Sequence, residues 1–247
     1  MKITFLGTSH GVPFADRYCS CTMIETGGSV YFIDGGAPLI NLLLKYDIDL
    51  TKLRALFATH THGDHINGVP DLVNLLNWYF KQGKLQVYMP EQNAIDAIKN
   101  LLWAMDVSPL DEERLPMRAY SEGFVYEDEN IRVTPLPTRH MEHIGRPAFG
   151  FLVEAEGKKL YFSGDMSGQL EKQDFPAYTL ENEVDLLVCE MAHFDVEHVA
   201  PYLEKCKAKQ LLFNHVFPVY KFDKINALNG KYGYPIRTVD DGEVIEL

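Results

Sequence analysis

The chain has 247 residues, of which 46% are hydrophobic, and it carries a formal net charge of −12. This length suits one α/β domain, and we predict a single domain over residues 1–247 with a large core. The acidic balance disfavours binding of extended nucleic acid, because phosphates are attracted by basic surfaces. Divalent ions held by the protein would still attract a small anionic substrate. No apolar run approaches the ~20 residues that cross a membrane, so we expect no membrane span.

The N-terminus lacks the features of a signal peptide, since Lys2 alone precedes an apolar run that breaks at Gly7. The four cysteines match neither a disulfide framework nor a zinc finger. Cys19 and Cys21 are too close for a usual disulfide, and a structural metal there would need further ligands. We interpret the cysteines as thiols of a reducing compartment and expect a cytoplasmic protein.

The first half of the chain alternates apolar strands with helices. We predict a strand over residues 1–7 and a hairpin of residues 22–26 and 30–34, which turns at Gly27 and Gly28. Residues 107–117, which are charged and contain proline, are predicted to form a loop or lid. The other elements expected in this half are helices over residues 38–46, 66–82 and 91–105 and strands over residues 53–58 and 85–89.

The second half is richer in strands. We predict a hairpin of residues 149–154 and 159–163, and a helix over residues 196–206 with Asp195 as its cap. Further strands are expected over residues 131–136, 184–189, 211–214 and 239–247, the last as a hairpin or edge strand. Two mixed sheets packed face to face, with helices on both outer faces, would bury these runs. The predicted fold is therefore a four-layer αβ/βα sandwich of the α/β class.

The most informative stretch is residues 59–65, Thr-His-Thr-His-Gly-Asp-His, between a predicted strand and a predicted helix. Imidazole nitrogens and carboxylate oxygens are the ligands that zinc and related metals prefer. His60 and His62 alternate and so point the same way, whereas Asp64 and His65 lie beside them. We therefore predict two neighbouring metal sites rather than a polar loop held by hydrogen bonds.

A dinuclear site needs more ligands than this turn supplies, and other candidates follow apolar strands elsewhere. His140 and His143 come after residues 131–136, Asp165 comes after residues 159–163, and His215 ends the strand over residues 211–214. Polar residues at the carboxyl ends of strands can converge at one edge of a sandwich. His140 lies nearer its strand than His143, so we favour His140 as the ligand. His143 would then support a ligand from outside the metal site or face the substrate.

The pattern His-x-His-x-Asp-His after a strand resembles the signature of the metallo-β-lactamase superfamily, whose fold is the αβ/βα sandwich. The resemblance implies two divalent metal ions, with zinc preferred and manganese or iron as alternatives. Asp165 would bridge them, since a carboxylate can bind two cations ~3.5–4 Å apart. Asp34 matches a structural aspartate that orients residues 59–65, the histidine loop, through hydrogen bonds. The implied ligands are His60, His62 and His140 for one ion, Asp64, His65 and His215 for the other, and Asp165 for both.

Three further stretches resemble the ribonuclease Z and small phosphodiesterase branch of this superfamily. They are Phe-Leu-Gly-Thr at residues 5–8, followed by Val12, Pro13 and Arg17; Asp-Leu-Leu-Val-Cys-Glu at residues 185–190; and His-Val-Phe-Pro-Val-Tyr at residues 215–220. The long basic arm with which ribonuclease Z grips tRNA has no counterpart between residues 85 and 130.

In that branch a histidine paired with a glutamate helps to protonate the leaving group. The glutamate corresponds to Glu190. Placed by its distance from His215, the histidine falls on His193, with His198 as the alternative. The loop between Glu190 and His193 is much shorter than in ribonuclease Z.

These observations predict a dinuclear metal-dependent hydrolase, a phosphodiesterase that acts on a small phosphodiester or nucleotide-type substrate through a metal-bound hydroxide. The expected catalytic residues are Asp64, which orients the nucleophile or takes its proton, and His193 with Glu190, which protonate the leaving group. His10 and Arg17 are candidates for additional positive charge at the entrance. A lactonase, a thiolester hydrolase and a ribonuclease Z-like tRNA 3′ endonuclease remain alternatives, and a homodimer is left open.

Overall fold

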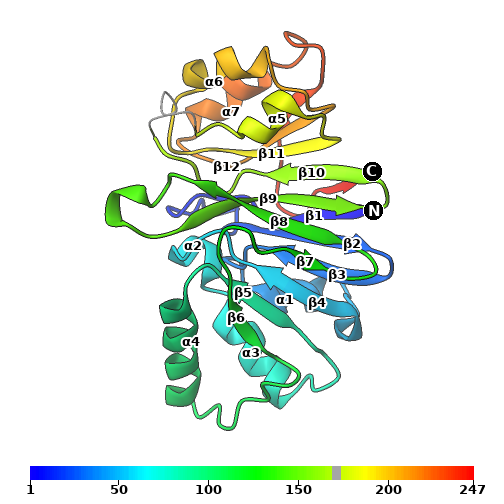
Figure 1. The fold of residues 1–247 in the computed structure, drawn as a ribbon, viewed down its shortest axis with the longest axis vertical. Helices are drawn as coiled ribbons and strands as arrows, with labels where there is room; N and C mark the ends of the chain where they lie inside the picture. Colours follow the sequence, from blue (N-terminus) through cyan, green and yellow to red (C-terminus); the bar gives the residue numbers. More distant parts are fainter. Residues whose placement is uncertain (169–173) are drawn as a thin grey trace.

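The computed structural model describes residues 1–168 and 174–247. Within those ranges the strands form two seven-stranded sheets that face one another, with helices on their outer surfaces (Figure 1). This arrangement confirms the predicted four-layer αβ/βα sandwich. Among the described residues, none of the helices has the length and apolar character needed to cross a membrane.

The first sheet has the strand order β14-β1-β2-β3-β4-β5-β6. Its strands β1 to β3 pair antiparallel, whereas β3 to β6 pair in parallel. The strands are β1 (Lys2–Gly7), β2 (Cys21–Thr26), β3 (Ser29–Ile33), β4 (Leu53–Phe57), β5 (Gln86–Met89), β6 (Met117–Ala119) and β14 (Val244–Glu246). The helices of this half are α1 (Leu39–Lys45), α2 (Gly63–Ile66), α3 (Val69–Trp78) and α4 (Gln92–Ala104).

The second sheet has the order β13-β12-β11-β10-β9-β8-β7. Strands β7 to β10 pair antiparallel and β10 to β13 pair in parallel. The strands are β7 (Tyr126–Glu127), β8 (Arg132–Thr138), β9 (Ala148–Ala155), β10 (Lys158–Phe162), β11 (Leu186–Met191), β12 (Leu211–Val216) and β13 (Ile236–Thr238). Its helices are α5 (Ala177–Glu181), α6 (Val196–Leu203) and α7 (Tyr220–Asn226).

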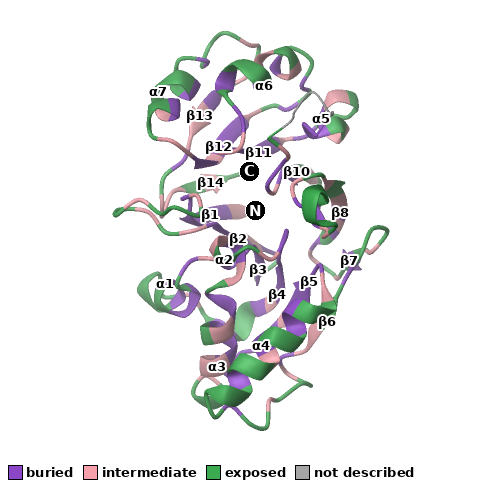
Figure 2. Ribbon diagram, turned by 90° about the vertical axis from the view of Figure 1, so that its left-hand side faces the viewer, coloured by how far each residue is buried: buried purple, intermediate pink, exposed green. Residues whose placement is uncertain are grey.

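Aromatic and branched side chains fill the space between the two sheets. The ring of Phe57 in β4 stacks on Tyr88 in β5, with centroids 5.2 Å apart, and lies 5.9 Å from the ring of Phe151 in β9. Phe57 and Phe151 are fully buried, and burial of such apolar area is the main favourable contribution to folding. Figure 2 shows the buried strands in the middle of the molecule and the exposed outer sides of the helices. The packing of the two sheets therefore fixes the positions from which the loops at their edge begin.

Two predicted elements differ from the observed ones. The helix expected over residues 66–82 begins earlier, as α2, and is interrupted before α3. A Cβ on Gly68 would lie 1.9 Å from the carbonyl oxygen of Ala37, so the chain passes too closely there for any side chain. Asp195 lies at the N-cap of α6 as predicted, but its side chain makes no capping hydrogen bond.

The C-terminal segment forms an edge strand of the opposite half. Strand β14 pairs antiparallel with β1, with Ile3 opposite Ile245, so the last strand completes the first sheet. Residues 107–116 form neither a helix nor a regular strand, in agreement with the predicted loop. The short elements α5, α7, β6, β7 and β13 were not predicted, because none of them shows a clear periodic apolar pattern, and β6 begins at Met117, the last residue of the predicted loop.

Candidate metal centre

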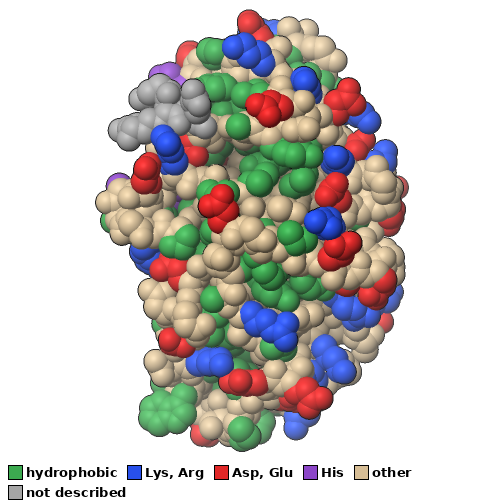
Figure 3. Space-filling view, viewed as in Figure 1, with side chains coloured by type: hydrophobic (Ala, Val, Ile, Leu, Met, Phe, Trp, Pro, Cys, Tyr) green, Lys and Arg blue, Asp and Glu red, His purple; other side chains and the backbone are tan. Residues whose placement is uncertain are grey.

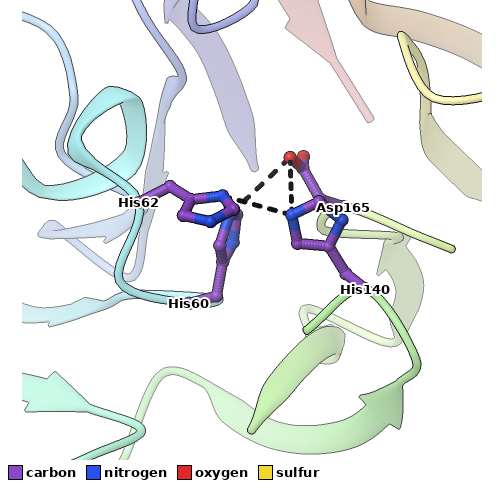
Figure 4. Close-up of side chains that lie close together, drawn as sticks. All are labelled: His60, His62, His140 and Asp165. Atoms are coloured by element: carbon purple, nitrogen blue, oxygen red, sulfur yellow. Dashed lines mark hydrogen bonds and ion pairs between the residues drawn. The ribbon is translucent and has the colours of Figure 1, made fainter. Parts of the chain in front are cut away.

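Three histidines and one aspartate converge at the edge of the sandwich (Figure 4). His60 and His62 follow β4, whereas His140 follows β8 and Asp165 follows β10. The Nδ1 atom of His62 lies 3.0 Å from Nε2 of His60 and 3.2 Å from Nε2 of His140. Asp165 Oδ2 lies 3.7 Å from Nε2 of both His60 and His140. The facing nitrogens of three rings are thus aimed at one small volume beside a carboxylate.

A second group lies on the other side of Asp165 and contains Asp64, His65 and His215. Asp64 Oδ2 lies 3.1 Å from His215 Nε2 and 3.5 Å from His65 Nε2. Asp165 Oδ1 lies 3.4 Å from His65 Nε2 and 3.6 Å from His215 Nδ1. The two oxygens of Asp165 therefore face different groups, Oδ2 the first and Oδ1 the second.

His215 reaches the site through an irregularity in β12. Asn214 pairs with Glu190 and Val216 pairs with Met191, so His215 is an additional residue without a partner in β11. Its φ is 49°, in the left-handed region, and its backbone N–H donates to the carbonyl oxygen of Thr8. A β-bulge of this kind changes the direction of a side chain, which here turns the imidazole toward Asp64.

The donor set fits divalent cations. His65 Nδ1 lies 2.8 Å from Asp34 Oδ2, and His140 Nδ1 lies 3.2 Å from the carbonyl oxygen of Met166. Each ring thus donates its N–H away from the site, which leaves the lone pair of Nε2 facing inward. Among the described residues, the buried atoms His65 Nε2 and His215 Nδ1 have no hydrogen-bond partner. Buried ring nitrogens without partners are costly unless a cation binds them.

Asp34 holds the histidine loop, as predicted. Besides binding His65, its Oδ1 accepts hydrogen bonds from the backbone N–H and the hydroxyl of Thr59 at 2.7 and 3.0 Å. Asp34 is 5% exposed and has a φ of 63°. The carboxylate therefore connects the end of β3 with the turn after β4 and fixes the orientation of the His65 ring.

The charges around the site favour a bound cation. Burial raises the pKa of Asp64, but the hydrogen bond with His215 and the nearby His65 lower it by more, so this carboxyl stays ionised. For Asp165, the neighbouring His215 and His65 likewise outweigh burial and hold its pKa well below the usual range. Burial lowers the pKa of His60, so its ring is neutral and can bind a metal.

Glu190 and His193 form a pair beside Asp165. His193 Nδ1 lies 2.8 Å from Glu190 Oε1, and His193 Nε2 lies 3.8 Å from Asp165 Oδ2. Burial lowers the pKa of His193, but the carboxylates of Glu190 and Asp165 raise it to about 9 overall. These two contacts turn Nδ1 of the imidazole toward Glu190 and Nε2 toward the site. His198, the alternative, is exposed on α6.

The other candidates from the sequence lie differently. His143 is exposed on the 3-10 helix Glu142–Ile144 and belongs to neither group of candidate ligands. His10 stacks on Phe217 with ring centroids 4.8 Å apart and lies 5.1 Å from the ring of His215. Arg17 is bound by Thr8 and the carbonyl oxygen of Val239 and forms an ion pair with Asp240, so its charge is already neutralised.

One contact to the histidine loop was missed in the sequence. Arg146 Nη2 donates to Thr61 Oγ1 at 2.6 Å, and its Nε donates to Glu91 Oε1 at 2.9 Å. Thr61 stands between His60 and His62. The three partners are far apart in the chain, and none belongs to a metal-binding pattern.

The sequence also matches known proteins. A family model described as anti-Pycsar protein Apyc1 matches residues 1–216. Ribonuclease Z of Bacillus licheniformis is 34% identical over 159 residues, which cover 62% of this chain and 49% of that protein. The chain spans about half the length of the curated relatives it matches.

The structure matches solved structures over nearly its whole length. The metallo-β-lactamase fold protein YhfI from Bacillus subtilis superposes with a TM-score of 0.78 at 17% identity and 99% coverage of both chains. The short form of human tRNase Z superposes with a TM-score of 0.76 at 22% identity, covering 100% of this chain and 99% of that one. These similarities establish the metallo-β-lactamase fold.

Proposed function

The chain belongs to the family of the anti-Pycsar protein Apyc1, within the metallo-β-lactamase superfamily, and we propose that it is a dinuclear metal-dependent phosphodiesterase. One observation carries the proposal. Two groups of side chains that could bind metal meet at Asp165, and the hydrogen-bonded pair of His193 and Glu190 stands beside them. This combination would place two cations and a proton donor around one phosphodiester bond.

Seven side chains would hold the ions, and zinc is preferred over manganese or iron. His60, His62 and His140 would bind one ion, Asp64, His65 and His215 the other, and Asp165 both. Two such ions, when bound, lower the pKa of a coordinated water toward neutrality and offset negative charge on a phosphoryl group.

The protein's own residues would then orient the reactants and move protons. Asp64 is ionised, and its Oδ2 lies 3.5 Å from His65 Nε2 and 3.1 Å from His215 Nε2. From this position it would accept a hydrogen bond from the attacking water. His193 would donate its Nε2 proton to the leaving oxygen. Glu190, buried against Nδ1 of the same ring, raises the pKa of His193 and fixes the direction in which Nε2 points.

The preferred substrate is a small phosphodiester, such as a cyclic nucleotide or a short nucleotide derivative. Two cations favour an anionic group, whereas the net charge of −12 repels a long polyanion. On the face seen in Figure 3, Lys and Arg side chains are interspersed with Asp and Glu rather than gathered in a stripe. The second candidate is a ribonuclease Z-like tRNA 3′ endonuclease, which the similarity to ribonuclease Z favours.

A leaving-group comparison tests the proton donor. General-acid catalysis contributes ~10²–10⁴-fold when the leaving group is an alkoxide, whereas a nitrophenolate leaves unaided. We expect His193→Ala to slow hydrolysis of an alkyl diester by about 100-fold or more and that of a nitrophenyl diester by less than about 5-fold. His198→Ala, on the exposed face of α6, is the matched control and should change neither rate.

The wild-type protein should be assayed in parallel on a lactone and a thiolester. Higher kcat/KM on either of these than on the alkyl diester would replace the proposed phosphodiesterase by a lactonase or thiolester hydrolase. Equal losses on both diesters in His193→Ala would remove His193 as the acid.

A further inference from the structure

The loop that carries His193 connects β11 to α6. Three backbone carbonyls, one at the end of β11 and two in the loop, receive hydrogen bonds from one side chain. Lys221 Nζ donates to the carbonyl oxygens of Met191, Ala192 and Phe194, at 3.2, 3.1 and 2.7 Å. An ammonium has three N–H donors, so these bonds use all of them. Lys221 belongs to α7 and is only 3% exposed, which is rare for a lysine.

The backbone amides of the same loop are held by the opposite charge. Glu190 Oε2 accepts hydrogen bonds from the backbone N–H groups of Ala192 and His193, at 2.7 and 3.2 Å. Glu190 is 1% exposed, so both charged groups that bind the loop are buried. A buried charge is tolerated only when it is fully hydrogen-bonded. The backbone of this segment satisfies both charges: its amides donate to Glu190, and its carbonyls accept from Lys221.

We propose that Lys221 is a positioning residue for His193. This inference rests on the proposed function, in which His193 is the proton donor. Two of the carbonyls that Lys221 binds belong to the residues on either side of His193, so these bonds define the backbone path through that residue. The hydrogen bonds of the Lys221 ammonium end on these carbonyls, so Lys221 acts through the backbone that carries His193. A displacement of about 1 Å of a catalytic group is enough to cost ~10²-fold in rate.

The first test compares two lysines of one helix. Lys221→Met keeps the length of the side chain and removes the three donors. Lys224→Met is the matched control, because Lys224 also lies on α7 and its ammonium binds Glu197 on the surface at 2.7 Å. We expect Lys221→Met to slow the alkyl diester about 10–100-fold and the nitrophenyl diester less than about 3-fold, whereas Lys224→Met leaves both rates unchanged.

A double variant shows whether Lys221 acts through His193. If it does, Lys221→Met combined with His193→Ala should hydrolyse the alkyl diester no more slowly than His193→Ala alone, because residues that act as a unit are not additive. Equal losses on the two diesters in Lys221→Met, or additive losses in the double variant, would overturn the proposal.

Hydrogen exchange of the backbone amides in residues 191–195 gives a readout independent of activity. We expect exchange there to be at least about tenfold faster in Lys221→Met than in the wild type or Lys224→Met. Lys221→Gln, which keeps part of the donor capacity, should fall between them. Unchanged exchange would overturn the role of Lys221. If His193→Ala slows both diesters equally, His193 is not the proton donor, and that part of the proposed function is wrong. The exchange rates alone then decide whether Lys221 holds the loop.

Discussion

Asp165 is the residue at which the two candidate metal sites meet. Its side chain is 3% exposed, and each of its oxygens faces ring nitrogens from a different group. An imidazole presents one nitrogen to one cation, whereas a carboxylate can bind two. The shared aspartate would therefore decide the number of ions. A single structural zinc needs about four ligands, and seven are present here.

The sequence indicated the candidate ligands but not the residues that support them. His140 was favoured because it lies close to a strand end, and β8 indeed runs to Thr138 and brings His140 against His62. Its role as a ligand stays a prediction. Arg146 and Lys221 gave no such signal, because each acts through a contact with a distant segment that only the folded chain creates.

The assignment of His140 can be tested by metal content. The wild-type protein, purified with saturating metal, should contain two ions per chain. Removing a ligand leaves a cation undercoordinated, so His140→Ala should lose about one ion, measured by elemental analysis. His143→Ala, whose side chain is exposed, is the matched control and should keep both. Loss of metal in the His143 variant alone would reverse the assignment.

At the scale of elements, apolar runs predicted the long strands and helices well. The break between α2 and α3 was missed, although Pro70, in the first turn of α3, has no backbone N–H with which to continue a helix from α2. The short helix α7 was also missed, although it carries Lys221. Elements of this length are stabilised by tertiary contacts rather than by their own periodicity.

Three elements are joined at the tip of the histidine loop by Arg146. Its guanidinium connects Thr61 with Glu91, the N-cap residue of α4. We expect Arg146→Gln to weaken metal binding about 10–100-fold, the usual cost of removing a residue that supports a ligand. Competition with a chelator measures this affinity without relying on catalysis.

Arg132→Gln is the control for Arg146→Gln. Arg132 forms a comparable ion pair with Glu127, at 2.7 Å, but both side chains are exposed and neither touches the histidine loop. Exposed pairs of this kind contribute ~0–1 kcal/mol to stability, so this variant should bind metal like the wild type. Equal affinity in both variants would show that the contact with Thr61 does not support the ligands.

At the scale of the whole molecule, the two halves of the sandwich contribute different candidate ligands. His60, His62, Asp64 and His65 come from the first sheet and its connections, whereas His140, Asp165 and His215 come from the second. Ions bound at this edge would link the halves, and a ligand that binds only the folded state stabilises it.

Metal removal should therefore lower the melting temperature. At 100 times the Kd, one bound ion adds ~2.7 kcal/mol, which for a chain of this size corresponds to about 5–10 °C. Melting curves of metal-saturated and chelator-treated protein measure the difference. Asp165→Ala should lose most of this metal-dependent increase, and His143→Ala should keep it. A wild-type protein that melts at the same temperature with and without metal would contradict binding across the two halves.

The net charge of the chain bears on the size of the substrate. A protein that makes 6–10 phosphate contacts loses ~10³–10⁵-fold in affinity between 50 and 200 mM salt, because counterions are released on binding. A chain with a net charge of −12 and without a long basic arm should make few such contacts. We therefore expect kcat/KM for a small alkyl diester to exceed that for precursor tRNA.

The salt dependence of kcat/KM separates the two substrates further. Over the same range of salt, kcat/KM for the small diester should fall by less than about tenfold, because only the metal centre and its immediate surroundings contact one phosphate. The assay is hydrolysis of both substrates by the full chain at 50, 100 and 200 mM salt. Efficient maturation of precursor tRNA with a steep salt dependence would instead require an extended basic contact surface, and it would favour the endonuclease over the small phosphodiesterase.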